Sequence, residues 1–311
     1  MSMRLKELVF VIRNDSEYLV MLDVIGCGAL NYDRLYYVKK LARTGEHQPV
    51  FGMREGPGGS SANTIAWLAD LGFKTGFLGA LGNDSEGERI LGDFKKRGVN
   101  TSGIKRFKGS TGLIIGFVDS TGERTLYPYP KANDKFVLNE KMVEYARNAK
   151  FLHLSSFVNS LQLSEQKRLV KKVPKKVRLS FTPGDLYAER GFEELKPLLA
   201  RSHVVFMNEA ELKQVTGLSY RRGAKFLNET GVEISVITRG SKGCFIKTPG
   251  KEISVACNSC KPVDTTGAGD SFAAGFLAGL LKNKSLKECG RLGNQLAGRC
   301  IKQKGARSVL K

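Results

Sequence analysis

Cysteines, long apolar runs and a secretory leader are scarce or missing in this sequence. The 311 residues include six cysteines, which is too few for a disulfide scaffold and typical of a protein kept in a reducing cytoplasm. The richest apolar run, Phe272–Leu281, has about half of the ~20 residues that a membrane-spanning helix needs. The first residues form no apolar core followed by a cleavage site. We therefore expect a cytoplasmic protein with no membrane partner.

Acidic residues are also few, and their shortage makes the chain strongly basic. Lys and Arg number 50 against 30 Asp and Glu, which gives a formal charge of +20. Seven bases fall within Lys167–Arg178, as in a surface that follows nucleic-acid phosphates. That run has no interleaved aromatic residues, and the chain shows no helix-turn-helix or zinc-finger pattern, so a solvated basic face is the favoured interpretation. We expect no nucleic-acid partner and keep a basic nucleic-acid-binding protein only as a remote alternative.

Common phosphate-binding and metal-binding patterns are missing as well. The chain contains no Gly-x4-Gly-Lys-Ser/Thr loop, and no Gly-x-Gly-x-x-Gly follows its first predicted strand. Cys257 and Cys260 have the spacing of a metal or redox site, but none of the three histidines lies at a ligand spacing from them. A zinc site is therefore disfavoured, while a disulfide between the two cysteines remains open.

Strand-like and helix-like patterns alternate along most of the chain. Helical spacing of apolar residues covers Ser60–Leu71 and Ser85–Lys96, and a glycine follows each segment closely. Short apolar runs predict strands at Tyr18–Gly26, Phe73–Gly82, Lys150–Leu154, Val177–Phe181, His203–Met207 and Ile234–Thr238, with a late hairpin at 243–247 and 252–256. This alternation predicts an α/β fold with a mostly parallel sheet flanked by helices.

Two pairs of β-type runs interrupt that alternation. Leu113–Val118 and Arg124–Tyr129 are joined by a Gly-containing hairpin loop, and Leu35–Val38 can pair with Pro49–Met53. Together they predict a small antiparallel sheet, a lid, near residues 34–54 and 108–130. No repeat or linker divides the chain, so we expect a single domain over residues 1–311. The exposed edge of the lid is a natural place for a homodimer contact.

A glycine-rich turn before the helix of residues 268–281 carries the most chemical information. Gly267, Ala268 and Gly269 can present backbone N–H groups at the helix N-terminus, where the helix dipole also favours an anion. Asp270 follows in the first helical turn. Its carboxylate can accept a proton from a substrate hydroxyl while the N–H groups stabilise a transferring phosphoryl group. Taken alone, such a turn is more often an ordinary glycine turn with a helix-capping acid.

The longer string Asp264–Phe272, DTTGAGDSF, resembles the C-terminal signature of the ribokinase-like (PfkB) carbohydrate kinase family. Gly58–Asn63, GGSSAN, followed by Ala66–Gly72, resembles the N-terminal signature of the same family. The segments 79–87 and 98–102 also match the family, and the resemblance covers residues 22–309. It implies a three-layer ribokinase-like fold with a small β-sheet lid, and a kinase that uses ATP and Mg²⁺.

The resemblance implies an acceptor site built from two segments. Asn31 and Asp33, after the first strand, would bind sugar hydroxyls. Gly58, Gly59 and Asn63 would hold the same sugar, because glycine lets the backbone approach closely and Asn offers both a donor and an acceptor. Alone, Asn63 would be read as an ordinary residue of a helix N-terminus, but the double-glycine context favours a ligand role.

The resemblance also implies metal and nucleotide sites. Asn208 and Glu211, an Asn-x-x-Glu motif, would organise Mg²⁺ and phosphate through water, although the same pair could simply start a helix. The family's nucleotide loop resembles residues 238–243, and its adenine pocket falls near the last helix; the nucleotide ligands implied are Thr238, Gly240, Gly243 and Asn294. Asp264 and Thr266, with the loop 304–306, match positions that hold a monovalent cation in some members, so potassium activation is plausible.

Two positions depart from the family pattern. Ser155 stands where ribose-using members carry a Glu, and Thr182 stands where many members have an Asp before Pro183. The loss of a carboxylate beside the sugar suggests a substrate other than free ribose. It could be a nucleoside, whose base takes the space, or a sugar that already bears a phosphate, which an acid would repel.

We therefore predict in-line transfer of the γ-phosphoryl group of ATP to a hydroxyl of a ribose-like pentose or of a sugar phosphate such as ribose-1-phosphate. A nucleoside kinase of the same family is the alternative. Asp270 would accept the proton, the N–H groups of residues 267–269 would stabilise the transition state, and Mg²⁺ would bridge the phosphates. The lid would close over the sugar and exclude water.

Overall fold

Alternating strands and helices build the larger part of the molecule, in a computed structural model that describes residues 21–258 and 260–307. Among these residues a nine-stranded sheet has the order β13-β12-β11-β10-β9-β8-β1-β4-β5. Its strands are β1 (Leu22–Cys27), β4 (Thr75–Gly82), β5 (Asn100–Phe107), β8 (Ala149–Ser155), β9 (Arg178–Thr182), β10 (Val204–Asn208), β11 (Ile234–Thr238), β12 (Cys244–Thr248) and β13 (Lys251–Val255). The pairings are parallel except for those of β12 with β11 and β13. The predicted parallel sheet with a late hairpin is confirmed.

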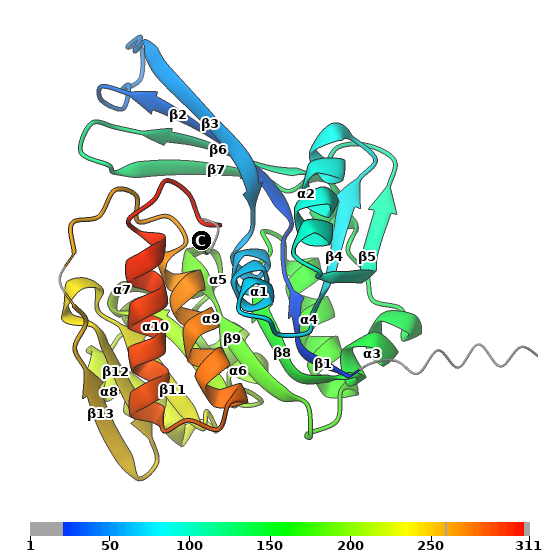
Figure 1. Ribbon diagram of the computed structural model, residues 1–311, viewed down its shortest axis with the longest axis vertical. Coiled ribbons are helices and arrows are strands. Elements are labelled where there is room, and N and C mark those ends of the chain that lie inside the picture. The colour runs from blue at the N-terminus through cyan, green and yellow to red at the C-terminus, as the bar shows by residue number, and fades with distance from the viewer. Residues whose placement is uncertain (1–20, 259, 308–311) are drawn as a thin grey trace, which may run out of the picture.

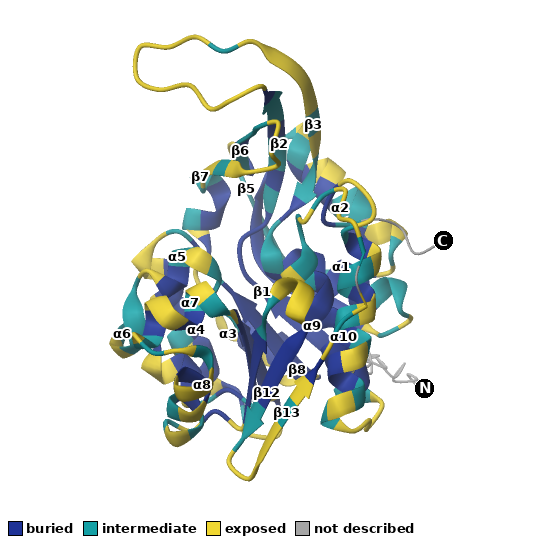
Figure 2. Ribbon diagram, turned by 90° about the vertical axis from the view of Figure 1, so that its left-hand side faces the viewer, coloured by how far each residue is buried: buried dark blue, intermediate teal, exposed yellow. Residues whose placement is uncertain are grey.

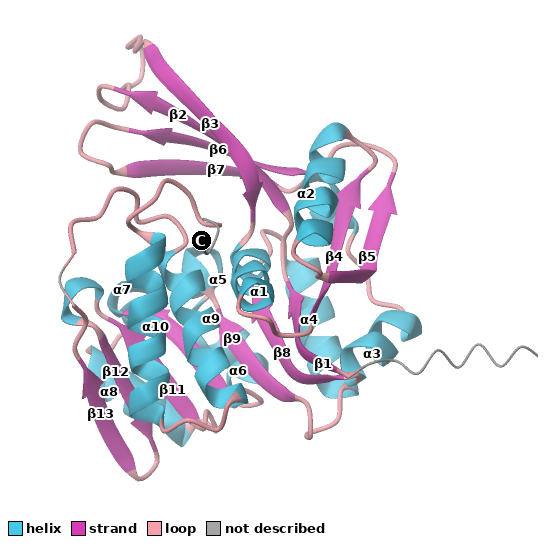
Figure 3. Cartoon of the chain, in the orientation of Figure 1, coloured by secondary structure: helices cyan, strands magenta, loops and turns pink. Residues whose placement is uncertain are grey.

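Helices cover both faces of this sheet and create three layers (Figures 1 and 3). One face packs against α1 (Ser60–Asp70), α2 (Ser85–Lys96), α9 (Ala268–Leu281) and α10 (Leu286–Cys300). The other packs against α3 (Glu140–Arg147), α4 (Ser160–Lys172), α5 (Gly184–Ala188), α6 (Gly191–Leu199), α7 (Glu209–Thr216) and α8 (Tyr220–Glu229). Two 3₁₀ turns, η1 (Lys131–Lys135) and η2 (Gly240–Lys242), complete the elements.

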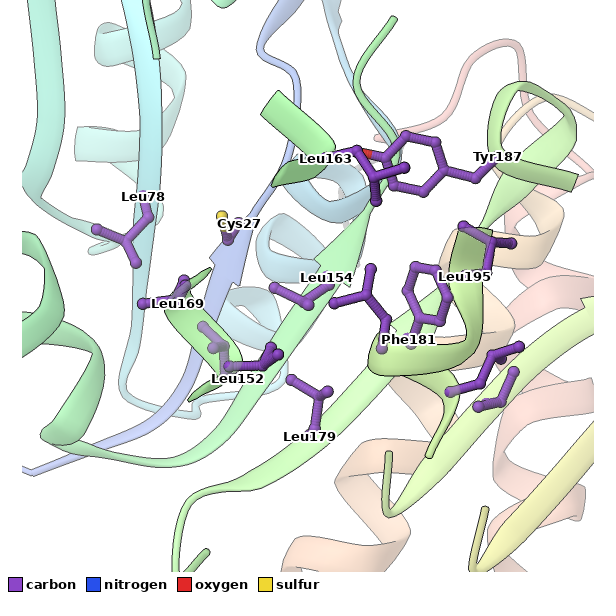
Figure 4. Close-up of a cluster of buried hydrophobic side chains, with 14 of the residues drawn as sticks. Cys27, Leu78, Leu152, Leu154, Leu163, Leu169, Leu179, Phe181, Tyr187 and Leu195 are labelled. Atoms are coloured by element: carbon purple, nitrogen blue, oxygen red, sulfur yellow. The ribbon is translucent and has the colours of Figure 1, made fainter. Parts of the chain in front are cut away.

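Two apolar cores lie between these layers because strand side chains alternate between the faces of the sheet. On β8, Leu152 and Leu154 belong to one core and Phe151 to the other. Figure 4 shows the first core, where Leu154 and Phe181 from the strands meet Leu163, Tyr187 and Leu195 from the helices. The inner strands of the central sheet are accordingly deeply buried, whereas its edge strands β5 and β13 are partly exposed (Figure 2). A core of this size holds the ends of the parallel strands in fixed positions.

A second sheet projects from the carboxyl end of β1 and forms the lid (Figure 1). Its strands β2 (Asn31–Val38), β3 (Val50–Gly58), β6 (Gly112–Val118) and β7 (Arg124–Tyr129) lie in the order β3-β2-β6-β7. The two predicted pairs, β2 with β3 and β6 with β7, are antiparallel, but β2 and β6 join them in parallel. The lid sheet is therefore mixed rather than antiparallel throughout.

The predicted elements agree with the observed ones to within a few residues, with two exceptions. The strand β5 was not predicted, and the part of the predicted strand Tyr18–Gly26 that precedes Met21 lies outside the described residues. Helix α2 has the predicted bounds, with Asp84 as its N-cap. Within residues 21–258 and 260–307, no helix is long and apolar enough to cross a bilayer.

Candidate active site

A pocket of about 180 Å³ lies between the lid and the carboxyl ends of the central strands. It collects predicted site residues from three distant parts of the chain. Its lining consists of Asn31, Asp33, Leu35, Gly59, Ser60, Asn63, Ile114, Arg124, Leu126, Thr266 and Asp270. The predicted base therefore shares one cavity with the predicted acceptor residues Asn31, Asp33, Gly59 and Asn63, whereas Gly58 does not line it.

Asp270 lies in the first turn of α9, where two side chains of α1 hold its carboxylate. The Ser60 hydroxyl donates to Oδ1 at 2.7 Å, and the Asn63 amide Nδ2 donates to Oδ2 at 2.7 Å. Burial raises the pKa of Asp270, while these two hydrogen bonds and the charges of Arg307 and Arg124 oppose that rise. The two sequence signatures thus meet at one oriented carboxylate.

The glycine turn before Asp270 has the backbone of an anion site. Gly267 is the N-cap of α9 with φ 77°, and a Cβ there would lie 2.6 Å from Ala306 atoms, so only glycine fits. The Ala268 N–H closes a turn on the Thr265 carbonyl at 3.2 Å, whereas the first i→i−4 bond of the helix comes from Ser271. The N–H groups of Gly269 and Asp270 therefore point out of the helix end, and that of Ala268 does not serve as predicted.

Asp33 faces the pocket from the lid strand β2. Its carboxylate packs so closely on the backbone of Gly58 that a Cβ there would lie 2.3 Å from both oxygens. Burial raises the pKa of Asp33 to about 7; the charge of Arg307 opposes this and that of Asp270 adds to it. Its Oδ1 is buried and has no hydrogen-bond partner among the described residues. An atom of this kind needs an external donor, as a sugar hydroxyl would provide.

Asn31 is oriented by a residue that the sequence analysis missed. The Asn133 amide Nδ2 donates to Asn31 Oδ1 at 2.9 Å and to the Leu30 carbonyl at 3.1 Å. Asn133 also accepts from the Leu30 N–H at 2.9 Å. Since Asn133 belongs to η1, about 100 residues away, no local motif marks it.

Arginines from the lid reach the loop before α9 and occupy the predicted cation position. Asp264 accepts at Oδ1 from the Thr266 N–H and at Oδ2 from the Gly305 N–H, both at 2.8 Å, and Arg54 Nη1 lies 3.4 Å from Oδ2. The Thr266 hydroxyl accepts from Arg124 Nη1 at 2.5 Å. Burial alone would raise the pKa of Asp264, but these hydrogen bonds leave it lowered. A guanidinium and two N–H donors already serve this carboxylate, so the site does not fit a potassium ion as it stands.

The predicted magnesium ligands form a capping box at the start of α7. Asn208 Oδ1 accepts from the Glu211 N–H, and Glu211 Oε2 accepts from the Asn208 N–H, both at 2.8 Å. Asn208 and Glu211 thus start a helix, which was the alternative to a magnesium site. Burial and the nearby carboxylates of Asp185 and Asp270 raise the pKa of Glu211 to about 7. A hydrated divalent cation would relieve this repulsion, so the oxygen donors fit Mg²⁺ bound through water.

No group of three or more His, Cys, Asp or Glu side chains in the described part of the chain could hold a metal ion directly. The two half-exposed cysteines Cys257 and Cys260 are free thiols rather than a disulfide.

The predicted nucleotide residues meet around the turn that follows β13. The Asn294 amide donates to the carbonyls of Val255 and Ala256, each at 3.2 Å. Gly243 packs against the same turn, and Cys257 Sγ donates to the Ser241 carbonyl at 3.0 Å. A cleft of about 590 Å³ opens here; its lining includes Ala256, Cys257, Asn258, Arg291, Asn294 and Arg299.

Thr238 and Gly240 lie at the end of β11 and the start of η2, beside this turn. Arg239 between them is held by Glu209 at 2.7 Å and lies over the ring of Tyr220, so it is engaged within the protein.

The two departures from the family pattern differ in their surroundings. The Ser155 hydroxyl is buried and accepts from the Ser61 N–H at 2.9 Å, which fixes α1 rather than a substrate. Thr182 ends β9, and its hydroxyl is buried without a partner among the described residues. Neither residue lines the 180 Å³ pocket.

Comparison with known proteins agrees with this geometry. Residues 21–311 match the profile of the pfkB family of carbohydrate kinases. An uncharacterized sugar kinase of Archaeoglobus fulgidus is 41% identical over 78% of this chain and 97% of its own. An ATP-dependent ribose-1-phosphate kinase of Halopiger xanaduensis is 28% identical over 93% and 95% of the two chains. The structure of Arabidopsis thaliana ribokinase with ribose and ATP is similar with a TM-score of 0.78 and 25% identity, over 92% and 94% of the two chains.

Proposed function

The chain belongs to the pfkB family of carbohydrate kinases, and from this premise we propose that it transfers the γ-phosphoryl group of ATP to a hydroxyl of a ribose-like pentose or of a sugar phosphate such as ribose-1-phosphate. The observation that carries the proposal is Asp270. Its carboxylate is held by Ser60 and Asn63 in the pocket beneath the lid, next to the outward-facing N–H groups of α9.

The chemistry follows from these positions. A sugar hydroxyl that donates to Asp270 loses its proton to that carboxylate as its oxygen attacks the phosphoryl group. The N–H groups of Gly269 and Asp270 face the charge that develops on the transferring group. Mg²⁺, held through water by Asn208 and Glu211, would neutralise phosphate charge when bound. Leu35, Ile114 and Leu126 of the lid cover the pocket with apolar surface, which excludes competing water.

The substitution Asp270→Asn tests the mechanism. It keeps the shape and the hydrogen bond from Ser60 but cannot accept a proton, so we expect a folded protein whose turnover falls on the order of 10²–10⁴-fold. Circular dichroism and a coupled kinase assay measure the two properties. Retained turnover would remove Asp270 from the mechanism.

The acceptor site favours a substrate with a phosphate substituent. The 180 Å³ pocket adjoins a second cavity of about 280 Å³ that shares Leu35, Arg124 and Thr266 and is also lined by Lys304. A free pentose leaves this second cavity empty, whereas a phosphate there would lie near Arg124 and Lys304, in a cavity that Glu123 and Asp264 also line. A nucleoside base is the alternative occupant, since Tyr37 lines the same cavity.

A phosphorylation screen over ribose, fructose, nucleosides and ribose-1-phosphate separates these substrates. We expect the largest kcat/KM for the sugar phosphate. The substitution Arg124→Leu should raise KM for it on the order of tenfold or more and change KM for ribose little. A nucleoside with the largest kcat/KM would favour the alternative.

We also propose a homodimer through the lid in the cytoplasm. The lid face turned away from the pocket exposes Phe51, Met53 and Tyr127, and the rings of Tyr36, Phe117 and Tyr127 form a row with centroids 5.7 and 6.4 Å apart. An exposed aromatic patch of this kind is typical of a protein contact. Light scattering in solution measures the mass, and a monomer at assay concentration would contradict the dimer.

A further inference from the structure

A buried arginine from the C-terminal segment lies beneath the candidate active site. The side chain of Arg307 is only 5% exposed. It donates three hydrogen bonds of 2.8 Å, from Nε to Asn63 Oδ1, from Nη1 to Asp93 Oδ2 and from Nη2 to the Gly58 carbonyl. The segment that carries it leaves α10 and passes under the lid (Figure 1). Arg307 therefore links the end of β3, helix α1 and helix α2.

The partners of Arg307 are unusual for a residue that serves stability alone. A buried guanidinium needs a counter-ion, and Asp93 supplies one. Asp93 also pairs with Arg97 at 3.0 Å, so this acid serves two arginines. The other two hydrogen bonds of Arg307 go to Asn63 and Gly58, which are residues of the predicted acceptor site.

The bond to Asn63 fixes which side of its amide faces the catalytic carboxylate. An amide can flip, and a protonated Asp270 could bond to either its oxygen or its nitrogen. A guanidinium can only donate, so Arg307 keeps the amide oxygen on its own side in both protonation states of Asp270. Asn63 Nδ2 then remains 2.7 Å from Asp270 Oδ2. Its second N–H is left for the acceptor.

The positive charge of Arg307 also favours the ionised forms of the nearby carboxyl groups. It lowers the pKa of Asp33 and of Asp270 against the effect of burial, which raises both. Unlike Arg124, which belongs to the lid, Arg307 is fixed by two hydrogen bonds to helices of the body and by one to Gly58 at the end of the lid strand β3. Besides Arg307, the titratable or charged groups that face Asp270 are Arg124 of β7, Asp33 of β2, Glu211 of α7 and Cys300 of α10.

We infer that Arg307 is a positioning residue for phosphoryl transfer, which locks the Asn63 amide so that Asp270 stays oriented toward the acceptor hydroxyl. This inference rests on the proposed role of Asp270 as proton acceptor. Arg307 acts through Asn63 and Gly58 and touches no reacting atom.

The substitutions Arg307→Met and Arg307→Lys in the full chain test it through the pH dependence of kcat. Met removes both the hydrogen bonds and the charge, so we expect kcat to fall on the order of 10²-fold and the acid limb of its pH profile to move to higher pH. Lys keeps the charge but cannot make the three bonds together, so it should restore the acid limb and leave kcat reduced. Wild-type kcat and an unmoved limb in both variants would overturn the inference.

Arg97→Lys is the matched control for loss of a buried guanidinium. Arg97 donates to Asp93, Asp70 and the Arg307 carbonyl but has no bond to Asn63. We expect it to lower the thermal midpoint and leave the acid limb of kcat in place. Equal movement of the limb in the Arg97 and Arg307 variants would reduce Arg307 to a structural role.

Two further measurements keep the test decisive. If Arg307→Met does not fold, the effect of Arg307→Lys on kcat is measured in the wild-type protein and in the Asn63→Ala variant. If Arg307 acts through Asn63, Arg307→Lys should reduce kcat much less in the Asn63→Ala variant than in the wild-type protein. An equal loss in both backgrounds contradicts the inference. Asp270→Asn separates the two proposals. Retained turnover in this variant would contradict the proposed role of Asp270 as the base. An inactive Asp270→Asn variant together with wild-type-like Arg307 variants would contradict only the inference about Arg307.

Discussion

The carboxylate of Asp33, the proposed acceptor of a hydrogen bond from the sugar, is costly to bury in its ionised form. Its pKa of about 7 lies above the ordinary value of 3.8. When the pKa of a carboxyl group is higher in the folded than in the unfolded state, the folded protein binds the proton more tightly, and its free energy of unfolding falls as the pH rises between the two pKa values. The burial penalty of Asp33 therefore grows as the pH rises from about 4 through about 7 and is constant above that range.

The substitution Asp33→Asn separates the two effects. We expect it to raise the free energy of unfolding of the ligand-free protein by roughly 1 kcal/mol above pH 7, and by less as the pH falls toward 4. It should also raise KM for the sugar and remove the pH dependence of that KM. Thermal unfolding at several pH values and initial rates measure the two outcomes. A lower stability at pH 8 would mean that the ionised carboxylate has a partner that compensates for its burial.

The site residues that could be predicted from the sequence are those that lie in or beside a recognisable motif. Asp270, Asn63 and Asp33 were predicted because each lies in or beside a recognisable motif, and the structure places all three on one pocket. Asn133 lies in no recognised motif, and Arg307 follows the loop 304–306 without belonging to it; their partners are 102 and 244 residues away. Contacts of that separation are set by tertiary packing, which one sequence does not reveal.

Among the elements, the lid strand β3 connects acceptor binding to the loop before α9. Arg54 of that strand lies 3.4 Å from Asp264 and packs on Gly305, where the family resemblance had suggested a monovalent cation. A guanidinium that belongs to the chain itself therefore lies at the predicted cation position, and potassium activation stays an untested prediction. Arg54 of the lid and Asp264 of the loop before α9 thus form an ion pair between the lid and the body of the molecule.

Activity should therefore be independent of potassium. We expect turnover to differ by less than about twofold between potassium and tetramethylammonium chloride at equal ionic strength. Arg54→Met leaves Asp264 without its cation, so its turnover should fall on the order of tenfold and become sensitive to potassium. Initial rates in the two salts provide the measurement. Strong activation of the wild-type enzyme by potassium would show that the ion displaces Arg54.

The spacing of apolar residues predicted where most strands lie, but it did not predict every pair of neighbouring strands. Most strands of the central sheet were located from short apolar runs, whereas β5 was missed because Asn100–Phe107 mixes polar and basic residues with few apolar ones. The parallel join of β2 to β6 was also missed. Those strands are separated by two helices and two strands of the main sheet, so no turn sequence links them.

At the scale of the whole molecule, the formal charge is +20, and one basic run lies far from the candidate site. The basic run Lys167–Arg178 covers the end of α4 and the start of β9, at the edge opposite the carboxyl ends that carry the site. Part of it is neutralised locally, since Arg168 pairs with Glu165 and Lys172 with Glu140. This run therefore contributes little to phosphate binding, and the cations that matter are those around the pocket.

The electrostatic attraction between the cations near the site and ATP should make nucleotide binding depend on the salt concentration. Arg291, Arg299 and Lys302 line the 590 Å³ cleft beside Asn294, and Arg124 lines the 180 Å³ pocket, so these cations can attract a polyanion such as ATP over several ångströms. We expect KM for ATP to rise roughly threefold to tenfold when sodium chloride increases from about 0.05 to about 0.5 M, because the Debye length falls from about 14 to about 4 Å, while kcat changes little.

The double substitution Lys171→Glu and Lys175→Glu is the control for a field of the whole molecule. Both lysines are exposed and lie in the distant basic run, so they should leave KM for ATP unchanged at physiological ionic strength, where the Debye length is about 8 Å. Initial rates at varied ATP measure both effects. If reversing these two charges raised KM as much as added salt does, the net charge of the molecule would outweigh the local cations, and the basic run would belong to the functional surface after all.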